Sequence, residues 1–164
     1  MNLKKELEQY LKLNLDSDTS RFFGIAKAKM AVFREEECYD SSISNYIDEN
    51  KDDNNFQKLL FKYIDDKGLK DSEVYNKVYI DRRLFSKIRN DNYHPSKNTI
   101  IQLALSLELS EIELEELLIS ASYSLPKNNV FDLIIRFCFI NKIYNIDAVN
   151  EFLHDHNQEL LGNF

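Results

Sequence analysis

The chain has only three glycines, two prolines and two cysteines among its 164 residues, and it has no tryptophan. So few turn-forming residues argue against a turn-rich all-β fold, and the many Leu, Ile, Lys, Glu and Asp residues favour helices. Cys38 and Cys138 lie far apart and form no CxxC pair, so we expect reduced thiols and no disulfide framework. The composition therefore predicts an all-α protein.

Long apolar runs are also missing. No stretch approaches the roughly 20 apolar residues that cross a bilayer, and the first residues, MNLKKELEQYLKLNL, lack the apolar centre of a secretory signal. Charged residues at 30% and hydrophobic residues at 43% are typical of a folded domain. We expect a cytoplasmic protein that does not bind membranes.

The usual patterns of catalysis are absent from the sequence. It contains no glycine-rich phosphate loop, no HExxH, no GxSxG and no carboxylate pair identifiable by spacing. His154 and His156 form an HxH near the C-terminus, but no acid, His or Cys cluster joins them at a metal-ligand spacing. We therefore expect no enzyme activity, no cofactor and no metal.

The stretch from Leu69 to Thr99 carries the strongest pattern. Its apolar residues follow two helical spacings interrupted near Tyr79 and Ile80, which predicts two short helices joined by a tight turn. From Arg82 to Lys97 there are five basic residues against one acid, a local net charge of +4 in a chain of net charge −7. The second helix is thus expected to bury one side and to expose a basic one.

With these residues in view, the run from Phe56 to about Ser122 resembles the five-helix DNA-binding domain of the Xre/Cro/lambda-repressor family. The resemblance implies helices over Phe56–Lys67, Asp71–Val78, Asp81–Arg89, Ser96–Leu107 and Ser110–Ser120. More narrowly, IDRRLFSKIRNDNYHPSKNT, FDLIIRFCFINKIYNIDAVNEFL and a closing LLG resemble a bacterial helix-turn-helix variant that is often appended to effector proteins such as kinases and macro domains. The resemblance extends to Gly162 and implies a regulatory role.

DNA is the leading partner on this interpretation, with Asp81–Arg89 as the recognition helix. Arginine can donate two hydrogen bonds to guanine, asparagine can read adenine, and lysine or a helix start can hold phosphate. The candidate DNA-binding residues are Arg82, Arg83, Ser86, Lys87, Arg89, Asn90 and Lys97. His94, in the turn before Pro95, would also meet phosphate in such a complex.

A protein partner is the alternative, since tyrosine and arginine are common interface anchors. Tyr75, Tyr79 and Tyr93 would anchor it, and the chain would act as an adaptor or inhibitor, in a phage-defence or anti-defence setting. Asp71 stands where the Xre pattern has a phosphate-binding Gln. Tyr79 stands at its turn Gly, so Tyr79 must avoid positive φ or the helix pair must open. A homodimer is compatible with both interpretations.

The chain is expected to have three parts. Residues 1–55 form an N-terminal helical extension, with helices from Asn2 to Leu13, from Ser20 to about Cys38 and a turn over Ser42–Ile47, closed by a polar linker over 48–55. Residues 56–122 form the helix-turn-helix domain, and residues 123–164 form a helical cap packed on it.

Overall fold

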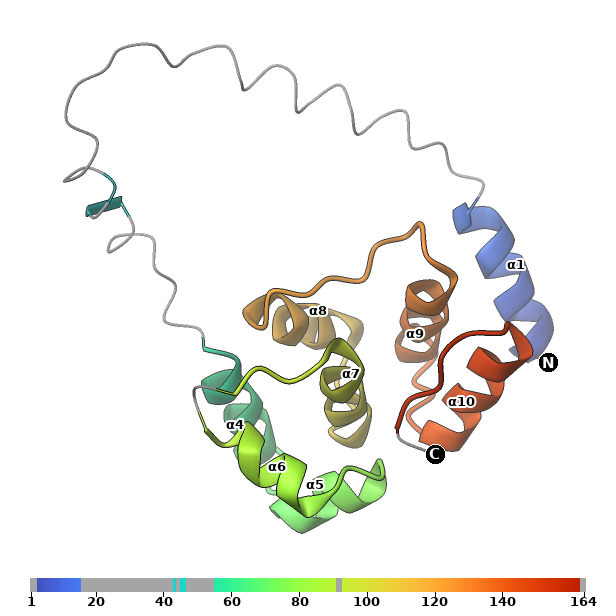
Figure 1. Ribbon diagram of the computed structural model, residues 1–164. Coiled ribbons are helices and arrows are strands. Elements are labelled where there is room, and N and C mark those ends of the chain that lie inside the picture. The colour runs from blue at the N-terminus through green and yellow to red at the C-terminus, as the bar shows by residue number, and fades with distance from the viewer. Residues whose placement is uncertain (1–2, 16–42, 44, 47–54, 91–92, 163–164) are drawn as a thin grey trace, which may run out of the picture. The chain divides into compact units, whose positions relative to one another are not determined.

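The structure is a computed structural model that describes residues 3–15, 43, 45–46, 55–90 and 93–162. These residues form eight helices and no strand, which confirms the prediction of an all-α protein. The helices are α1 (Leu3–Leu15), α4 (Phe56–Asp66), α5 (Asp71–Lys77), α6 (Arg82–Ile88), α7 (Lys97–Ser106), α8 (Glu111–Ser120), α9 (Val130–Ile140) and α10 (Ile146–Asp155) (Figure 1). Within the described ranges, no helix is long and apolar enough to cross a membrane.

Local signals set the helix ends. The predicted bounds of α4 to α8 agree with the observed ones to within one residue at each end. Ser96 is the N-cap of α7 and accepts a hydrogen bond from the Thr99 backbone amide at 3.3 Å. Gly68 ends α4 at φ +62°, a left-handed conformation that costs glycine little because it has no Cβ.

Helix α7 lies at the centre of the core, and each of its residues from Thr99 onward is buried. It holds α5 through two buried side chains: Gln102 donates to the Val78 carbonyl at 2.9 Å, and Ser106 donates to the Val74 carbonyl at 2.7 Å. Because polar groups that are buried need partners, these two bonds fix where α5, and with it α6, sits on the core.

The turn between α5 and α6 spans residues 78–81. Tyr79 adopts φ +57°, so it does not avoid the left-handed region. The Ile80 amide donates to the Tyr75 carbonyl at 2.9 Å across this turn, and Ile80 itself is buried. A bulky residue rarely takes this conformation, and here the surrounding contacts hold it.

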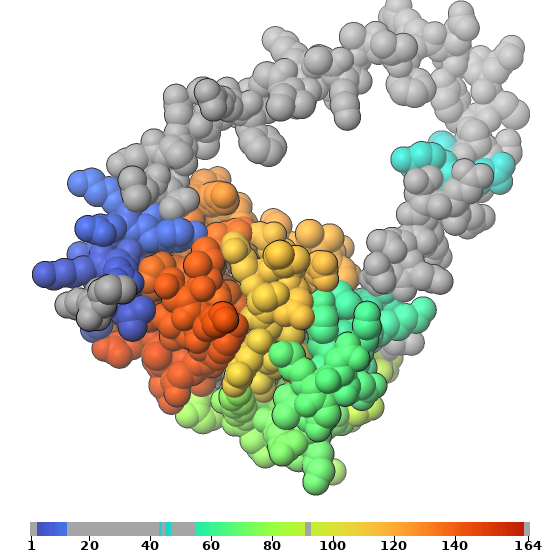
Figure 2. Space-filling view, turned by 180° about the vertical axis from the view of Figure 1, so that it is seen from behind, coloured from blue at the N-terminus to red at the C-terminus, as the bar shows by residue number. Residues whose placement is uncertain are grey.

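Helix α1 packs against α9 and belongs to the same compact unit as residues 54–164. Leu7 and Leu11 are buried there, and the rings of Tyr10 and Phe137 lie 5.6 Å apart. Lys4 pairs with Glu151 and Asp155 of α10, each at 2.9 Å. Figure 2 shows α1, in blue, lying against the orange surface of the C-terminal helices.

Of residues 16–53, the structure describes three. Ile43, Asn45 and Tyr46 are helical, as predicted for the turn over 42–47. The helix predicted from Ser20 to Cys38 and most of the predicted linker lie outside the described residues.

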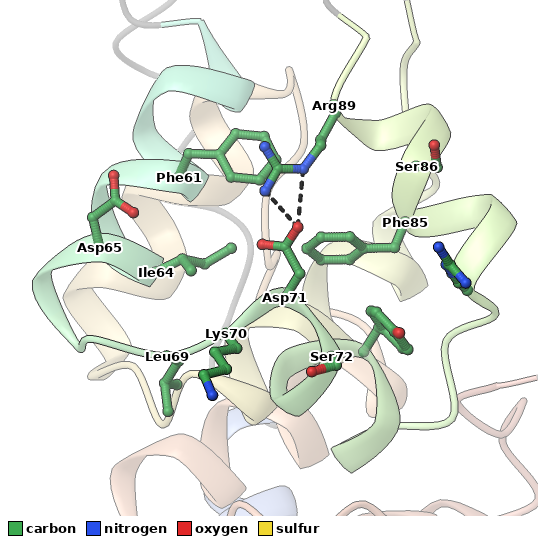
Figure 3. A pocket seen from close by; sticks show the side chains of 12 residues that line it. Phe61, Ile64, Asp65, Leu69, Lys70, Asp71, Ser72, Phe85, Ser86 and Arg89 are labelled. Atoms are coloured by element: carbon green, nitrogen blue, oxygen red, sulfur yellow. Dashed lines mark hydrogen bonds and ion pairs between the residues drawn. The ribbon is translucent and has the colours of Figure 1, made fainter.

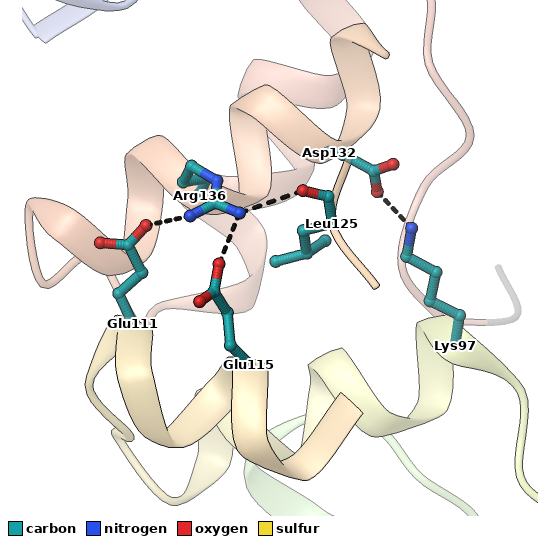
Figure 4. Close-up of polar contacts among 6 residues, drawn as sticks. All are labelled: Lys97, Glu111, Glu115, Leu125, Asp132 and Arg136. Atoms are coloured by element: carbon teal, nitrogen blue, oxygen red, sulfur yellow. Dashed lines mark hydrogen bonds and ion pairs between the residues drawn. The ribbon is translucent and has the colours of Figure 1, made fainter. Parts of the chain in front are cut away.

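The C-terminal helices α9 and α10 complete the core, and Leu133–Ile140 is buried except at Arg136 and Ile140. Burial lowers the pKa of the Arg136 guanidinium, but its ion pairs with Glu115 and Glu111 of α8 outweigh this effect and raise it. Arg136 also donates to the Leu125 carbonyl at 3.0 Å (Figure 4). The charged Arg136 side chain in this apolar run therefore links α9 to α8 through its ion pairs.

Candidate functional site

Helix α6 is anchored by one side and open on the other. Asp81 caps it by accepting from the Arg83 amide at 2.7 Å. Phe85 and Ile88, three residues apart, are buried against the core at 2% and 0% exposure. Leu84 is half-buried against the same core, so the buried side of α6 is apolar and its polar residues point outward.

Four outward residues form what we call the α6 basic face: Arg82, Arg83, Ser86 and Lys87. All four are exposed. Among the residues that the structure describes, no acid forms an ion pair with any of its three cations. These cations are therefore available to an external anion.

Arg89 is exposed, but its guanidinium contacts other residues of the chain. Its Nε donates to Oδ2 of Asp71 at 3.0 Å, and a second guanidinium nitrogen binds the same oxygen. Its guanidinium carbon also lies 4.6 Å from the centre of the Phe61 ring, a cation–π contact. The next residue, Asn90, is exposed, and its carbonyl accepts from the Gln57 side chain at 3.3 Å.

Lys97 points toward α9. Its Nζ lies 2.5 Å from Oδ1 of Asp132, whose side chain is only 1% exposed (Figure 4). The structure therefore brings Arg82, Arg83, Ser86 and Lys87 together, whereas Lys97 belongs to an interior ion pair.

The segment that enters α7 is held at both ends of its described part. The Tyr93 carbonyl accepts from the Gln57 side chain at 2.9 Å. His94 Nε2 lies 2.9 Å from the Ala121 carbonyl, and its ring lies 5.3 Å from that of Tyr123. These contacts tie this segment to α4 and to the end of α8.

The three candidate tyrosines have different surroundings. Tyr75 is half-buried, with its ring 5.5 Å from that of Phe85, and Tyr93 is half-buried against the core. Tyr79 is 57% exposed and donates to Asp147 of α10 at 3.3 Å. The charge of the Asp147 carboxylate, together with this hydrogen bond, raises the pKa of the Tyr79 phenol.

A groove of about 660 Å³ opens between α4, α5 and α6 (Figure 3). Arg82 and Ser86 of the α6 basic face belong to its lining. The remaining lining residues are Phe61, Ile64, Asp65, Leu69, Lys70, Asp71, Ser72, Tyr75, Phe85 and Arg89. No pattern in the sequence indicates this groove, because its walls come from three helices and share no periodicity.

Groups that could support metal binding or nucleophilic chemistry are sparse in the described part of the chain. No cluster of three His, Cys, Asp or Glu side chains there could hold a metal ion. Burial raises the pKa of the Cys138 thiol to about 12, and His156 contacts the Phe152 carbonyl through Nδ1 at 2.8 Å. What the described surface does offer is cations on one helix and a mixed-charge groove beside them.

No protein-family model matches the sequence, and no curated protein or solved structure is significantly similar to it.

Proposed function

We propose that this chain is a non-catalytic helix-turn-helix regulatory protein that binds DNA through α6. The observation that carries the proposal is the α6 basic face, with three exposed cations and no ion-paired acid among the described residues. In a chain of net charge −7, a helix whose cations pair with no acid in the described residues attracts a polyanion.

The order of the helices supports this assignment. Helices α5 and α6 are seven residues each and are joined by a four-residue turn, and α4, α7 and α8 surround them. On this proposal α4–α8 form the Xre-like domain, and α6 enters the major groove of the DNA. Helices α9 and α10 form the cap of this domain. Arg82 and Arg83 are then suited to guanine or phosphate, and Lys87 to phosphate.

The test is selection from a pool of random duplex DNA at two salt concentrations. The purified chain should enrich a subset of duplexes, and its affinity should fall with salt at a log–log slope of about −2.7 if three phosphates are neutralised. The variant Arg82→Ala/Arg83→Ala/Lys87→Ala should lose this binding while keeping its helical circular dichroism.

A matched control removes the same charge elsewhere. Lys5, Lys12 and Lys127 are exposed and lie on α1 and before α9. Their triple alanine variant should bind DNA within about twofold of the unmodified chain, because long-range charge effects are screened beyond about 10 Å. Equal losses in both triple variants would mean that net charge, not α6, governs binding.

A protein partner is the second candidate, and the exposed ring of Tyr79 favours it. If no duplex is enriched at either salt concentration while both triple variants stay folded, DNA binding is overturned. The next experiment is then a partner pull-down, with Tyr75→Ala and Tyr79→Ala as the variants that should lose the partner.

A further inference from the structure

In the groove, the cation Arg89 is paired with the carboxylate of Asp71. The guanidinium of Arg89 makes two hydrogen bonds to a single oxygen of Asp71 while it lies over the Phe61 ring (Figure 3). Arginine binds a phosphate through the same donors that it uses for a carboxylate. Asp71 therefore occupies the position that a phosphate oxygen would take at Arg89.

The groove is continuous with the α6 basic face, because Arg82 and Ser86 belong to both. The phosphate backbone of a DNA duplex lying along that face would also reach Arg89, which lines the same groove. Two acids, Asp71 and Asp65, stand in the groove, and both would repel it. Of these two acids, Asp71 is the one that the structure shows paired with a cation of the groove, Arg89.

The Asp71–Arg89 pair is open to replacement. The side chains are 37% and 53% exposed, and ion pairs at such exposure contribute little to stability because water solvates both partners. A phosphate can therefore compete with the Asp71 carboxylate for the guanidinium without unfolding α5 or α6.

Resting on the DNA-binding function proposed above, we propose that the groove between α4, α5 and α6 is a backbone-phosphate site of which Arg89 is the cation and Asp71 the built-in competitor. The Asp71 carboxylate weakens binding to any duplex equally, since phosphate contacts carry no base sequence. It thereby lowers the sequence-independent part of the affinity and leaves the preference between sequences unchanged.

The test compares isosteric amide variants on a random-sequence duplex over a range of salt. Asp71→Asn should bind about three- to tenfold more tightly at low salt, and its log–log salt slope should be steeper by about 0.9, the increment for one more phosphate contact. Asp65→Asn removes the same charge from the same groove without touching Arg89, so it should give a smaller gain than Asp71→Asn and leave the slope unchanged. Circular dichroism checks that each variant is folded.

A second substitution identifies the cation. Arg89→Ala in the Asp71→Asn background should abolish both gains. An unchanged slope in Asp71→Asn, or an equal gain in Asp65→Asn, overturns the competitor role while leaving DNA binding intact. If neither the unmodified chain nor Asp71→Asn binds any duplex, the proposed function fails and this inference fails with it.

Discussion

At the scale of single residues, Asn150 closes the C-terminal segment onto α10. Its amide donates to the Leu161 carbonyl at 3.0 Å and accepts from the Leu161 amide at 2.8 Å, and both residues are buried. Asn150→Ala leaves two buried backbone groups unpaired, so we expect it to lower the free energy of unfolding by about 2–4 kcal/mol. Urea denaturation followed by circular dichroism measures this loss.

The control is Asn128→Ala, because Asn128 is exposed and the structure shows no side-chain hydrogen bond for it among the described residues. Its effect should be below about 0.5 kcal/mol. Equal midpoints for the two variants would mean that the bonds to Leu161 do not contribute to stability.

Cys138 offers a second test at this scale. Burial in α9 raises the pKa of its thiol from 9.0 to about 12, so the folded state favours the protonated thiol. This contribution to stability is complete below pH 9 and is lost as the pH rises toward 12, because the unfolded thiol ionises first. In a Cys38→Ser variant, which leaves one thiol, we expect iodoacetamide at pH 8 to label Cys138 only as fast as the protein unfolds.

The same labelling in 8 M urea supplies the reference rate of an accessible thiol. If the folded protein is labelled at the urea rate, Cys138 is not enclosed by α9 and its neighbours.

At the scale of helices, α1 stabilises the unit through its buried side. Leu7 is 0% exposed and packs with the core that includes α9, whereas Leu3 is 44% exposed. Leu7→Ala should therefore cost about 2–5 kcal/mol of unfolding free energy, through lost burial and the cavity that remains. Leu3→Ala should cost less than about 0.5 kcal/mol. Urea midpoints of the two variants decide this, and similar midpoints would contradict the packing of α1 on α9.

The sequence predicted this helix but not its neighbour. The stripe of Leu3, Leu7, Tyr10 and Leu11 indicates that one side is buried, yet many apolar surfaces would satisfy it equally. Caps behave differently, because a cap and the amide it binds lie within a few residues. Ser96 at the start of α7 and Gly68 after α4 are such local signals, and a sequence shows them directly.

Helical spacing predicted which site residues are exposed, but it did not predict their contacts with residues far away in the sequence. The buried pair Phe85 and Ile88 determines that Arg82, Arg83, Ser86 and Lys87 are exposed, as the spacing predicted. The partners of Arg89 and Lys97 lie 18 and 35 residues away, and no local pattern specifies contacts at such separations. The local net charge of +4 therefore overstated the free positive charge of this segment.

At the scale of the whole molecule, the interior ion pair of Lys97 and Asp132 joins the central helix α7 to α9. Its acid is 1% exposed and its lysine 23%, so neutralising the acid leaves a largely buried ammonium group without a counter-charge. We expect Asp132→Asn to lower the free energy of unfolding by about 1–3 kcal/mol. This is less than for a fully buried pair, because water still reaches Lys97.

The matched control is Glu108→Gln, which neutralises the acid of an exposed pair. Lys77 and Glu108 are 46% and 55% exposed, and this pair should contribute less than about 1 kcal/mol. Because α7, α9 and the other described helices share one buried cluster, both variants should still unfold in a single transition. Far-ultraviolet circular dichroism and tyrosine fluorescence should then give the same urea midpoint, shifted for Asp132→Asn only. Separate midpoints by the two probes would instead show that the C-terminal helices unfold independently of α4–α8, with Lys97 and Asp132 at the boundary.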